Sequence, residues 1–168
     1  MNDLDKPARR QLIVTVGLPR SGKSTWVDRF IDTDKEMNYQ VICADDIRLG
    51  MGFQFDSKFE PVVWTVHHFA LRAALERGYS VIVDSCNTTV PGIRKYAQIA
   101  KEYDYQLVIL RINTPLDTCL ARNKGDGAVP DNVIRRMDKQ LSVTISSSFW
   151  ESIKDNILIC TEKENRNG

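Results

Sequence analysis

The sequence predicts an α/β fold, in which a parallel sheet is covered by helices on both faces within a single domain. Segments of strand composition alternate with segments of helical composition along the chain. The strand segments are continuous apolar runs, as at 12–16 and 107–110, rather than alternating polar and apolar residues. Continuous runs are typical of parallel strands that are buried on both faces. A chain of 168 residues is also of a size that usually forms one domain with one hydrophobic core.

The first half of the chain contains two predicted strands and two predicted helices. An apolar, β-branched strand is predicted over 11–16, and a second apolar strand over 39–44. Between them, 22–31 has helical composition with its large apolar side chains on one face. A long helix is predicted over 59–77, because apolar residues recur there at helical spacing and Gly78 is suited to end a helix.

The second half repeats the alternation, and a proline opens each of its helices. The predicted strands are 79–83, 106–112 and 156–160, and the predicted helices are 91–103, 115–123 and 130–147. We assign the folded domain to 11–160, with a flexible segment at 1–10 before it and a polar tail at 161–168 after it.

Composition narrows the functional classes. The net charge of +1 argues against the broad basic face that non-specific duplex binding needs, and leaves open a substrate held through a few phosphates. No apolar run approaches the roughly 20 residues of a membrane helix, and the N-terminal segment lacks the apolar core of a signal peptide. We therefore expect no membrane partner and a cytoplasmic location. The four cysteines lack metal-binding spacing, which favours reduced thiols in or near the core. The oligomeric state is left open.

A phosphate-binding loop is predicted between the first strand and the first helix. It matches the P-loop pattern with the run Gly17, Leu18, Pro19, Arg20, Ser21, Gly22, Lys23, Ser24 and Thr25. In such a loop the backbone N–H groups and the helix N-terminus hold phosphates, the lysine reaches the β and γ phosphates, and the serine binds magnesium. We expect this run to bind ATP and Mg²⁺, with Lys23 catalytic and Ser24 a metal ligand. We also expect the stem of Lys23 to face solvent, so that its removal leaves the fold intact.

Acidic residues at the ends of two further strands suggest how an acceptor is activated. Asp45 follows the second strand, where a carboxylate could take a proton from an acceptor hydroxyl, and Arg48 one turn later could bind an anionic group of the acceptor. Asp84 ends the third strand, a position from which an acidic residue holds magnesium directly or through water. A structural alternative is that Asp45 or Asp46 caps a helix. Both roles could hold at once, with Asp46 as the cap and Asp45 as the base.

A basic, glycine-containing loop over 122–130 is predicted to act as a lid. Arg122 and Lys124 lie in it, and Arg135 and Arg136 follow on the next predicted helix. Such a loop can close over ATP and bring positive charge to the phosphoryl group, and we expect Arg122 to contact ATP and to be catalytic. The alternative is a solvated loop with ordinary surface cations.

Together these segments resemble the kinase domain of bacteriophage polynucleotide 5′-hydroxyl kinases. The residues that carry the resemblance are 17–26, Asp45-Asp46-Ile47-Arg48, Val83-Asp84 with Asn87, and 128–137, and the likeness runs in the same order from about 11 to 141. The resemblance implies a five-stranded parallel sheet in the order 2-3-1-4-5, and transfer of the γ-phosphate of ATP to the 5′-hydroxyl of DNA or RNA. It also implies Asp45 as general base, Arg48 as the contact to the acceptor's phosphate, and Asp84 as support for the metal site.

The lid departs from the pattern of that family. The phage enzymes carry an additional lid arginine shortly after the position of Arg122, whereas this chain has Lys124, Gly125 and Asp126 there. Either Arg122 or Lys124 then replaces it, or the lid works differently. Related P-loop kinases phosphorylate small hydroxyl compounds, so a kinase for a nucleoside or a sugar is the alternative function. A nucleotide-binding ATPase without an acceptor is a third hypothesis.

Overall fold

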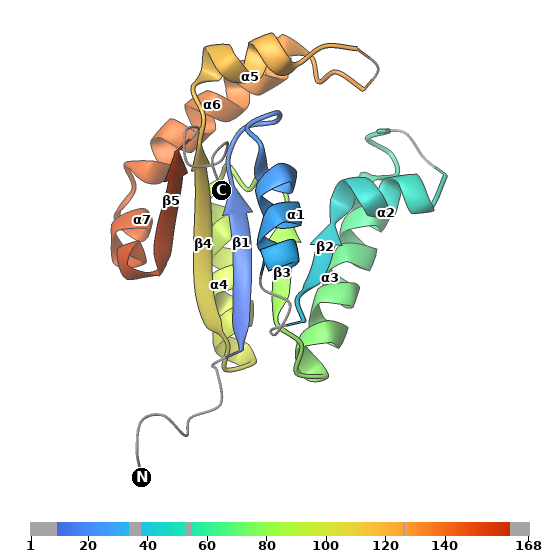
Figure 1. Cartoon of the computed structure of the whole chain (residues 1–168), viewed down its shortest axis with the longest axis vertical. Coiled ribbons are helices and arrows are strands. Elements are labelled where there is room, and N and C mark those ends of the chain that lie inside the picture. Colours follow the sequence, from blue (N-terminus) through green and yellow to red (C-terminus); the bar gives the residue numbers. More distant parts are fainter. Residues whose placement is uncertain (1–9, 34–37, 53–54, 126, 162–168) are drawn as a thin grey trace.

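The structure, a computed structural model, describes residues 10–33, 38–52, 55–125 and 127–161 (Figure 1). The strands are β1 (Gln11–Val16), β2 (Gln40–Cys43), β3 (Val81–Asp84), β4 (Gln106–Asn113) and β5 (Ile157–Thr161). The α-helices are α1 (Lys23–Thr33), α2 (Ala44–Gly50), α3 (Glu60–Glu76), α4 (Val90–Glu102), α5 (Leu116–Arg122), α6 (Asp131–Ile145) and α7 (Ser148–Ser152). A short 3₁₀ helix, η2 (Lys154–Asn156), precedes β5.

The described strands form one five-stranded parallel sheet in the order β2-β3-β1-β4-β5. β1 lies at its centre, with Leu12 opposite Val81 of β3 and Leu107 of β4. This confirms the predicted fold class and strand order. Because the strands are parallel, their carboxyl ends meet at one edge of the sheet. The chain crosses to opposite sides of β1 on reaching β3 and β4, and ligands of open α/β sheets bind at such a switch point.

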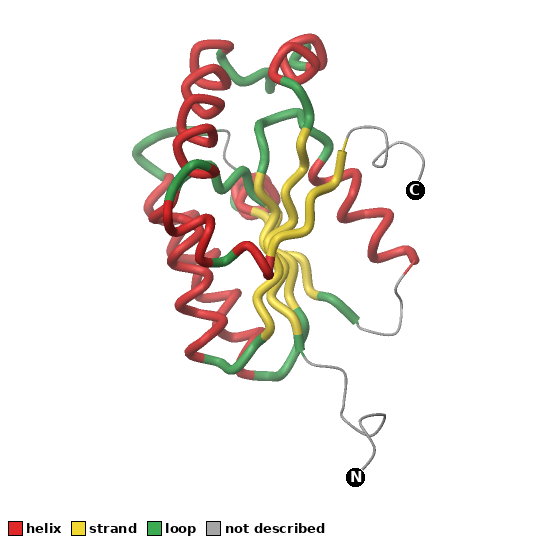
Figure 2. The backbone as a smooth tube through the Cα atoms, turned by 90° about the vertical axis from the view of Figure 1, so that its left-hand side faces the viewer, coloured by secondary structure: helices red, strands yellow, loops and turns green. Residues whose placement is uncertain are grey.

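Helices cover both faces of the sheet, but unequally (Figure 2). α1 packs on one face, where Val27 joins Ile13 in the smaller apolar core. α3, α4, α6 and α7 contribute to the larger core on the other face, which includes Leu12 and Val14. Successive residues of β1 thus point into two different cores. This explains why the strand is a continuous apolar run rather than an alternating one.

Local signals set the boundaries of the helices. The Thr89 hydroxyl accepts a hydrogen bond from the backbone N–H of Gly92 at 3.4 Å and caps α4. α3 ends at Glu76, and Gly78 follows with φ 82°, a conformation that glycine adopts without strain. The Tyr79 N–H still bonds to a carbonyl of α3. β3 therefore begins later than predicted.

The predicted helix over 130–147 extends two residues past the end of α6 at Ile145, and the separate helix α7 that follows was not predicted. The Ser147 hydroxyl accepts a hydrogen bond from the backbone N–H of Trp150 at 3.2 Å and caps α7. The break turns Trp150, which is 9% exposed, into the larger core. Three successive serines at 146–148 accompany the break, since serine favours helix caps over helix interiors.

Other expectations concern the ends of the chain and the cysteines. The predicted flexible segment 1–10 and polar tail 161–168 lie outside the described residues, apart from Arg10 and Thr161. All four cysteines are reduced thiols, of which one is buried and three are half-buried, as expected. No helix in the described part of the chain has the length and the apolar character needed to span a bilayer.

Candidate active site

A large cleft at the carboxyl edge of the sheet brings most of the predicted site residues together. Its volume is about 1680 Å³, more than the roughly 300–1,000 Å³ of a typical small-molecule pocket. The predicted residues that line it are Pro19, Arg20, Gly22, Lys23, Ser24, Thr25, Asp45, Arg48, Asp84 and Arg122. Gly17, Leu18 and Ser21 of the P-loop are buried behind this lining. A cleft of this size can hold a nucleotide together with a second substrate.

Two glycines permit the backbone path of the P-loop between β1 and α1. A Cβ atom on Gly17 would lie 2.9 Å from the Ser21 Oγ and 3.0 Å from the Ile112 carbonyl oxygen, which is too close for a side chain. Gly22 has φ 98°, in the left-handed region. The Thr114 hydroxyl donates to the Ser21 carbonyl at 2.8 Å and ties the loop to the end of β4. Such a path lets backbone N–H groups approach a phosphate.

Lys23 begins α1, and its side chain turns back into the P-loop. Its Nζ donates to the Leu18 carbonyl oxygen at 2.7 Å and to the Gly17 carbonyl oxygen at 3.3 Å. The residue is only 8% exposed, so the expectation that its stem faces solvent is wrong. The ammonium group lies inside the curl of the loop, where it can meet the charge of a phosphate.

Ser24 and Asp84, the predicted metal ligands, are in contact. The Ser24 hydroxyl donates to Asp84 Oδ2 at 2.6 Å, and the Thr15 hydroxyl lies 3.3 Å from Asp84 Oδ1. The described residues contain no group of three or more His, Cys, Asp or Glu side chains that could hold a metal. Magnesium bound with a nucleotide needs no such group, because it keeps several waters and takes phosphate oxygens as ligands. A hydroxyl and a carboxylate side by side fit that role.

The predicted acceptor side of the cleft begins at α2, whose N-cap is Cys43 without a side-chain hydrogen bond. Asp45 and Asp46 both lie within the first turn, so the interpretation of Asp46 as the cap is wrong. A carboxylate in the first turn is stabilised by the positive end of the helix dipole. The Asp45 side chain lines the cleft and is 89% exposed. It is therefore accessible to an acceptor hydroxyl.

Arg48 is held by Glu60, a carboxylate that sequence reasoning missed. Arg48 Nε donates to Glu60 Oε1 at 2.5 Å and Nη2 donates to Oε2 at 2.9 Å, while Nη1 pairs with Asp45. The hydrogen bonds between them raise the pKa of Arg48 and lower the pKa of Glu60. A guanidinium carries five N–H groups, so one on each of Nη1 and Nη2 remains for another anion. Arg48 can thus still receive a phosphate, at a position that Glu60 fixes.

The lid joins the end of α5 to the start of α6 and touches the P-loop. Arg122, the last residue of α5, lines the cleft, whereas Lys124 is not part of the lining. Arg20 Nη2 of the P-loop donates to the Gly127 carbonyl at 3.2 Å, which joins the two loops. The contact of Arg122 to ATP stays a prediction, made for a side chain that lines the cleft.

One stretch of the lid matches a guanine-reading pattern of GTPases. Asn123-Lys124-Gly125-Asp126 has the Asn-Lys-x-Asp spacing, so the sequence motifs by themselves do not distinguish ATP from GTP. The Asn123 side chain instead closes the lid on itself. Its Nδ2 donates to the Val129 carbonyl at 2.6 Å, and its Oδ1 accepts from the Val129 N–H at 3.0 Å. Both the nitrogen and the oxygen of the Asn123 amide are therefore hydrogen-bonded to the backbone of the lid. Asp126 lies outside the described residues.

Beyond Arg48 the cleft continues along α3 and α4, where the sequence analysis named no site residue. The additional lining residues there include Trp64 and His68 of α3, and Lys95 and Tyr96 of α4. On the lid side Arg136 of α6 lines the cleft and Arg135 does not. In the sequence these are ordinary helical positions. Only the packing of α3 beside α4 brings them to the cleft, which no local pattern reports.

Comparison with known proteins matches residues 12–143 to the family described as the AAA domain. An L-seryl-tRNA(Sec) kinase of Methanococcus maripaludis is 30% identical to this chain over 154 residues, which make up 90% of this chain and 60% of that protein. The chain thus spans about three fifths of the length of this curated relative.

Solved structures share the fold at lower identity. A chain of the Pnkp1/Rnl/Hen1 RNA repair complex has a TM-score of 0.72 and 23% identity, over 86% of this chain and 48% of that one. A gluconokinase from Sinorhizobium meliloti 1021 has a TM-score of 0.60 and 13% identity, over 92% of this chain and 84% of that one. The predicted resemblance to P-loop kinases is confirmed. The chain belongs to the AAA domain family, and its fold is shared by solved kinase structures.

Proposed function

We propose that this chain is an ATP-dependent kinase that transfers the γ-phosphate of ATP to the 5′-hydroxyl of a polynucleotide. The P-loop, the Ser24–Asp84 pair, Asp45 and Arg48 share one cleft, which supports a kinase site. A relative whose name specifies a seryl-tRNA as substrate supports an acceptor hydroxyl carried by a nucleic acid. Mg²⁺ as cofactor and a cytoplasmic location, where free thiols persist, are parts of the same proposal.

In this mechanism Asp45 takes the proton of the 5′-hydroxyl as the oxygen attacks the γ-phosphorus. The bond from the γ-phosphorus to the β–γ bridging oxygen breaks, and ADP leaves with that electron pair. Lys23 and Arg122 stabilise the charge on the phosphate oxygens. Mg²⁺ held by Ser24 and Asp84 would neutralise charge on the β and γ phosphates.

The observation that carries the choice of acceptor is the position of Arg48 beside Asp45. The two lie three residues apart on α2 and their side chains pair. In a nucleotide the 5′-hydroxyl and the 3′-phosphate belong to one sugar. Asp45, as the general base, and the guanidinium of Arg48 are adjacent. They can therefore meet the 5′-hydroxyl and the 3′-phosphate of one nucleotide at the same time.

A small-molecule kinase is the second candidate, and the same residues provide its support. Glu60 and Asp45 both pair with Arg48 in the structure, so two carboxylates already offset its charge. For an acceptor without a phosphate, Arg48 would serve only to orient Asp45. A gluconokinase also shares the fold.

The experiment is a transfer assay with labelled ATP and matched acceptors: a 5′-hydroxyl oligonucleotide, a nucleoside 3′-phosphate, the bare nucleoside, gluconate and seryl-tRNA. We expect the phosphate-bearing nucleotides to be preferred. Arg48→Ala should raise KM for them and change the bare nucleoside little. Asp45→Asn should lower kcat by about 10²- to 10⁴-fold. Asp46→Asn is the matched control, because Asp46 lies in the same turn and is not part of the cleft lining.

Two results would overturn the choice of acceptor. The small-molecule kinase would be favoured if wild type shows no preference for acceptors with a 3′-phosphate and Arg48→Ala lowers transfer to all acceptors equally. Transfer confined to seryl-tRNA would move the reacting hydroxyl from the 5′ end to the aminoacyl group.

A further inference from the structure

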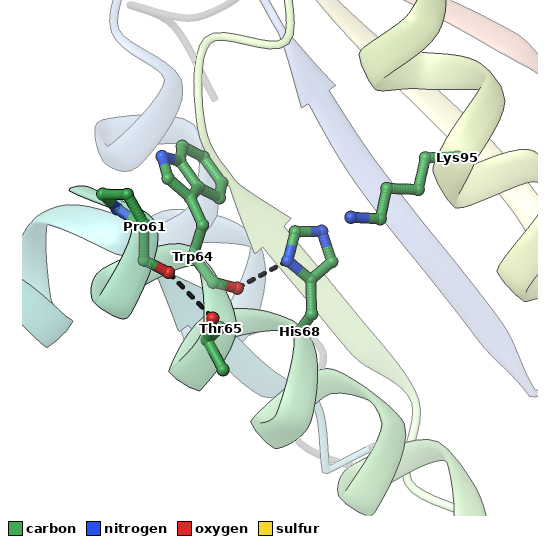
Figure 3. A pocket seen from close by; sticks show the side chains of 5 residues that line it. All are labelled: Pro61, Trp64, Thr65, His68 and Lys95. Atoms are coloured by element: carbon green, nitrogen blue, oxygen red, sulfur yellow. Dashed lines mark hydrogen bonds between the residues drawn. The ribbon is translucent and has the colours of Figure 1, made fainter.

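A smaller pocket opens beside the acceptor end of the cleft, between α3 and α4 (Figure 3). Its volume is about 370 Å³, and its lining is Pro61, Trp64, Thr65, His68 and Lys95. Trp64, His68 and Lys95 also line the main cleft, so the two spaces are continuous. A substrate that extends past Arg48 in this direction meets these three side chains.

The indole of Trp64 is oriented by the same carboxylate that holds Arg48. Trp64 Nε1 donates to Glu60 Oε2 at 3.1 Å, and Glu60 binds the guanidinium of Arg48 through both oxygens. The indole also packs against the buried His67 ring, with centroids 5.1 Å apart. An aromatic surface held in this way is preorganised for stacking, since little freedom remains to be lost on binding.

The other side of the pocket combines a neutral imidazole with an ammonium group. His68 Nδ1 donates to the Trp64 carbonyl at 2.5 Å, and burial, with Lys95 and Arg72 nearby, lowers the pKa of His68. Lys95 extends from α4 toward this ring (Figure 3). Within the described residues Lys95 takes part in no ion pair, whereas Arg72 is bound to Glu102 at 2.8 Å. Lys95 is therefore the cation that this pocket offers to an anion.

We propose that this pocket binds the second nucleotide of the acceptor strand, with its base against Trp64 and its 3′-phosphate at Lys95. The proposal rests on the polynucleotide kinase function. An aromatic ring can stack on any nucleobase, and an ammonium group binds a phosphate whatever the nucleotide sequence is. Recognition would then use two phosphates, one at Arg48 and one at Lys95. A chain with a net charge of only +1 suits contacts to a few phosphates rather than a long basic track.

Three acceptors separate the groups that the pocket would bind. A nucleoside 3′-phosphate, Np, offers only the phosphate for Arg48. The dinucleotide NpN adds a second base, and NpNp adds a second 3′-phosphate. The ratio of kcat/KM for NpN to that for Np then reports on the base, and the ratio for NpNp to NpN reports on the phosphate. Binding of the same compounds, measured by calorimetry with a non-hydrolysable ATP analogue, gives a readout independent of turnover.

We expect Lys95→Ala to reduce the NpNp to NpN ratio about fivefold, the size of one exposed charge contact. Lys101→Ala is the matched control, since Lys101 is also exposed on α4 but is not part of either lining. Trp64→Leu should reduce the NpN to Np ratio at least fivefold through lost stacking. Trp64→Phe keeps a ring but loses the N–H bond to Glu60, and should retain part of that ratio.

The outcomes distinguish the pocket from the function. If wild type phosphorylates Np, NpN and NpNp with equal kcat/KM, the subsite is overturned while the polynucleotide kinase stands. If no nucleotide acceptor is phosphorylated but a sugar is, both fail. If Lys95→Ala lowers kcat/KM equally for all three acceptors, Lys95 acts on the shared site and the subsite is overturned. If Trp64→Phe behaves like Trp64→Leu, stacking is overturned as the role of Trp64.

Discussion

At the scale of single residues, the lid offers two cations for the charge that develops on the γ-phosphate. We predict that Arg122→Ala lowers the single-turnover rate by roughly 10²- to 10³-fold, because a planar guanidinium can bind two phosphate oxygens in the transition state. Arg122 also lines the cleft, whereas Lys124 does not. Lys124→Ala should change the rate less than about fivefold. A larger loss for Lys124 than for Arg122 would reverse this assignment.

The residues that the sequence identified and those it missed differ in the range of their contacts. Lys23 and Ser24 belong to a motif of fixed spacing, and Asp84 ends a strand beside that motif, so local pattern sufficed to predict that they share one site. Glu60 was missed because its role depends on a contact to Arg48, twelve residues earlier and on another helix. A glutamate at the start of a helix is also explained by its favourable interaction with the helix dipole. The sequence alone therefore gives no sign that Glu60 binds Arg48.

At the scale of elements, the lid is a short loop that one asparagine closes. We predict that Asn123→Ala raises KM for ATP about tenfold, because two hydrogen bonds to Val129 are lost and the open loop must be ordered on binding. Asn132→Ala is the control, since Asn132 is exposed on α6. The measurement is steady-state kinetics with ATP and with GTP. If Asn123→Ala instead removes a preference for GTP, the asparagine reads a base and the structural role is wrong.

The individual strands and helices could be predicted from the sequence better than their packing against one another. Strands such as β1 and β4 were found because buried parallel strands have few polar residues. The short helix α7 was missed, because it has only five residues and its start is set by the capping bond of Ser147. The pairing of α3 with α4, which builds the pocket of Trp64 and Lys95, depends on the tertiary fold and has no local signal.

At the scale of the whole molecule, both the topology and the location of the site follow from the parallel sheet. A strand, a P-loop and a helix fix where the phosphates lie, and parallel strands place β2 and β3 with their carboxyl ends at the same edge. The strand order itself came from resemblance to a family, because alternation of strands and helices alone permits several orders. The sheet thus specifies the P-loop end of the cleft, and the helices that pack on it specify the end lined by α2, α3 and α4.

Folding stability should depend on pH through His67, a buried residue of α3 whose ring packs against Tyr96 of α4. His67 is fully buried, and neither ring nitrogen has a hydrogen-bond partner among the described residues. Burial, with the charges of His68 and Lys95, lowers the pKa of His67 from 6.5 to about 4. Below pH 6.5 His67 is protonated in the unfolded chain, whereas in the folded chain it stays neutral until the pH falls to about 4. The stability contribution is therefore complete above pH 6.5 and is lost as the pH falls toward 4.

We predict that this one histidine removes about 3 kcal/mol of the free energy of unfolding between pH 6.5 and 4, since each pKa unit corresponds to about 1.4 kcal/mol. Carboxylates add their own pH dependence, so the quantity to measure is the difference between wild type and His67→Phe in urea unfolding at several pH values. Phenylalanine keeps a ring between Trp64 and Tyr96 but cannot titrate. The difference should change by about 1 kcal/mol per pH unit between pH 5 and 6 and stay nearly constant above pH 7. Parallel curves for the two proteins would mean that His67 takes up its proton equally well in the folded state.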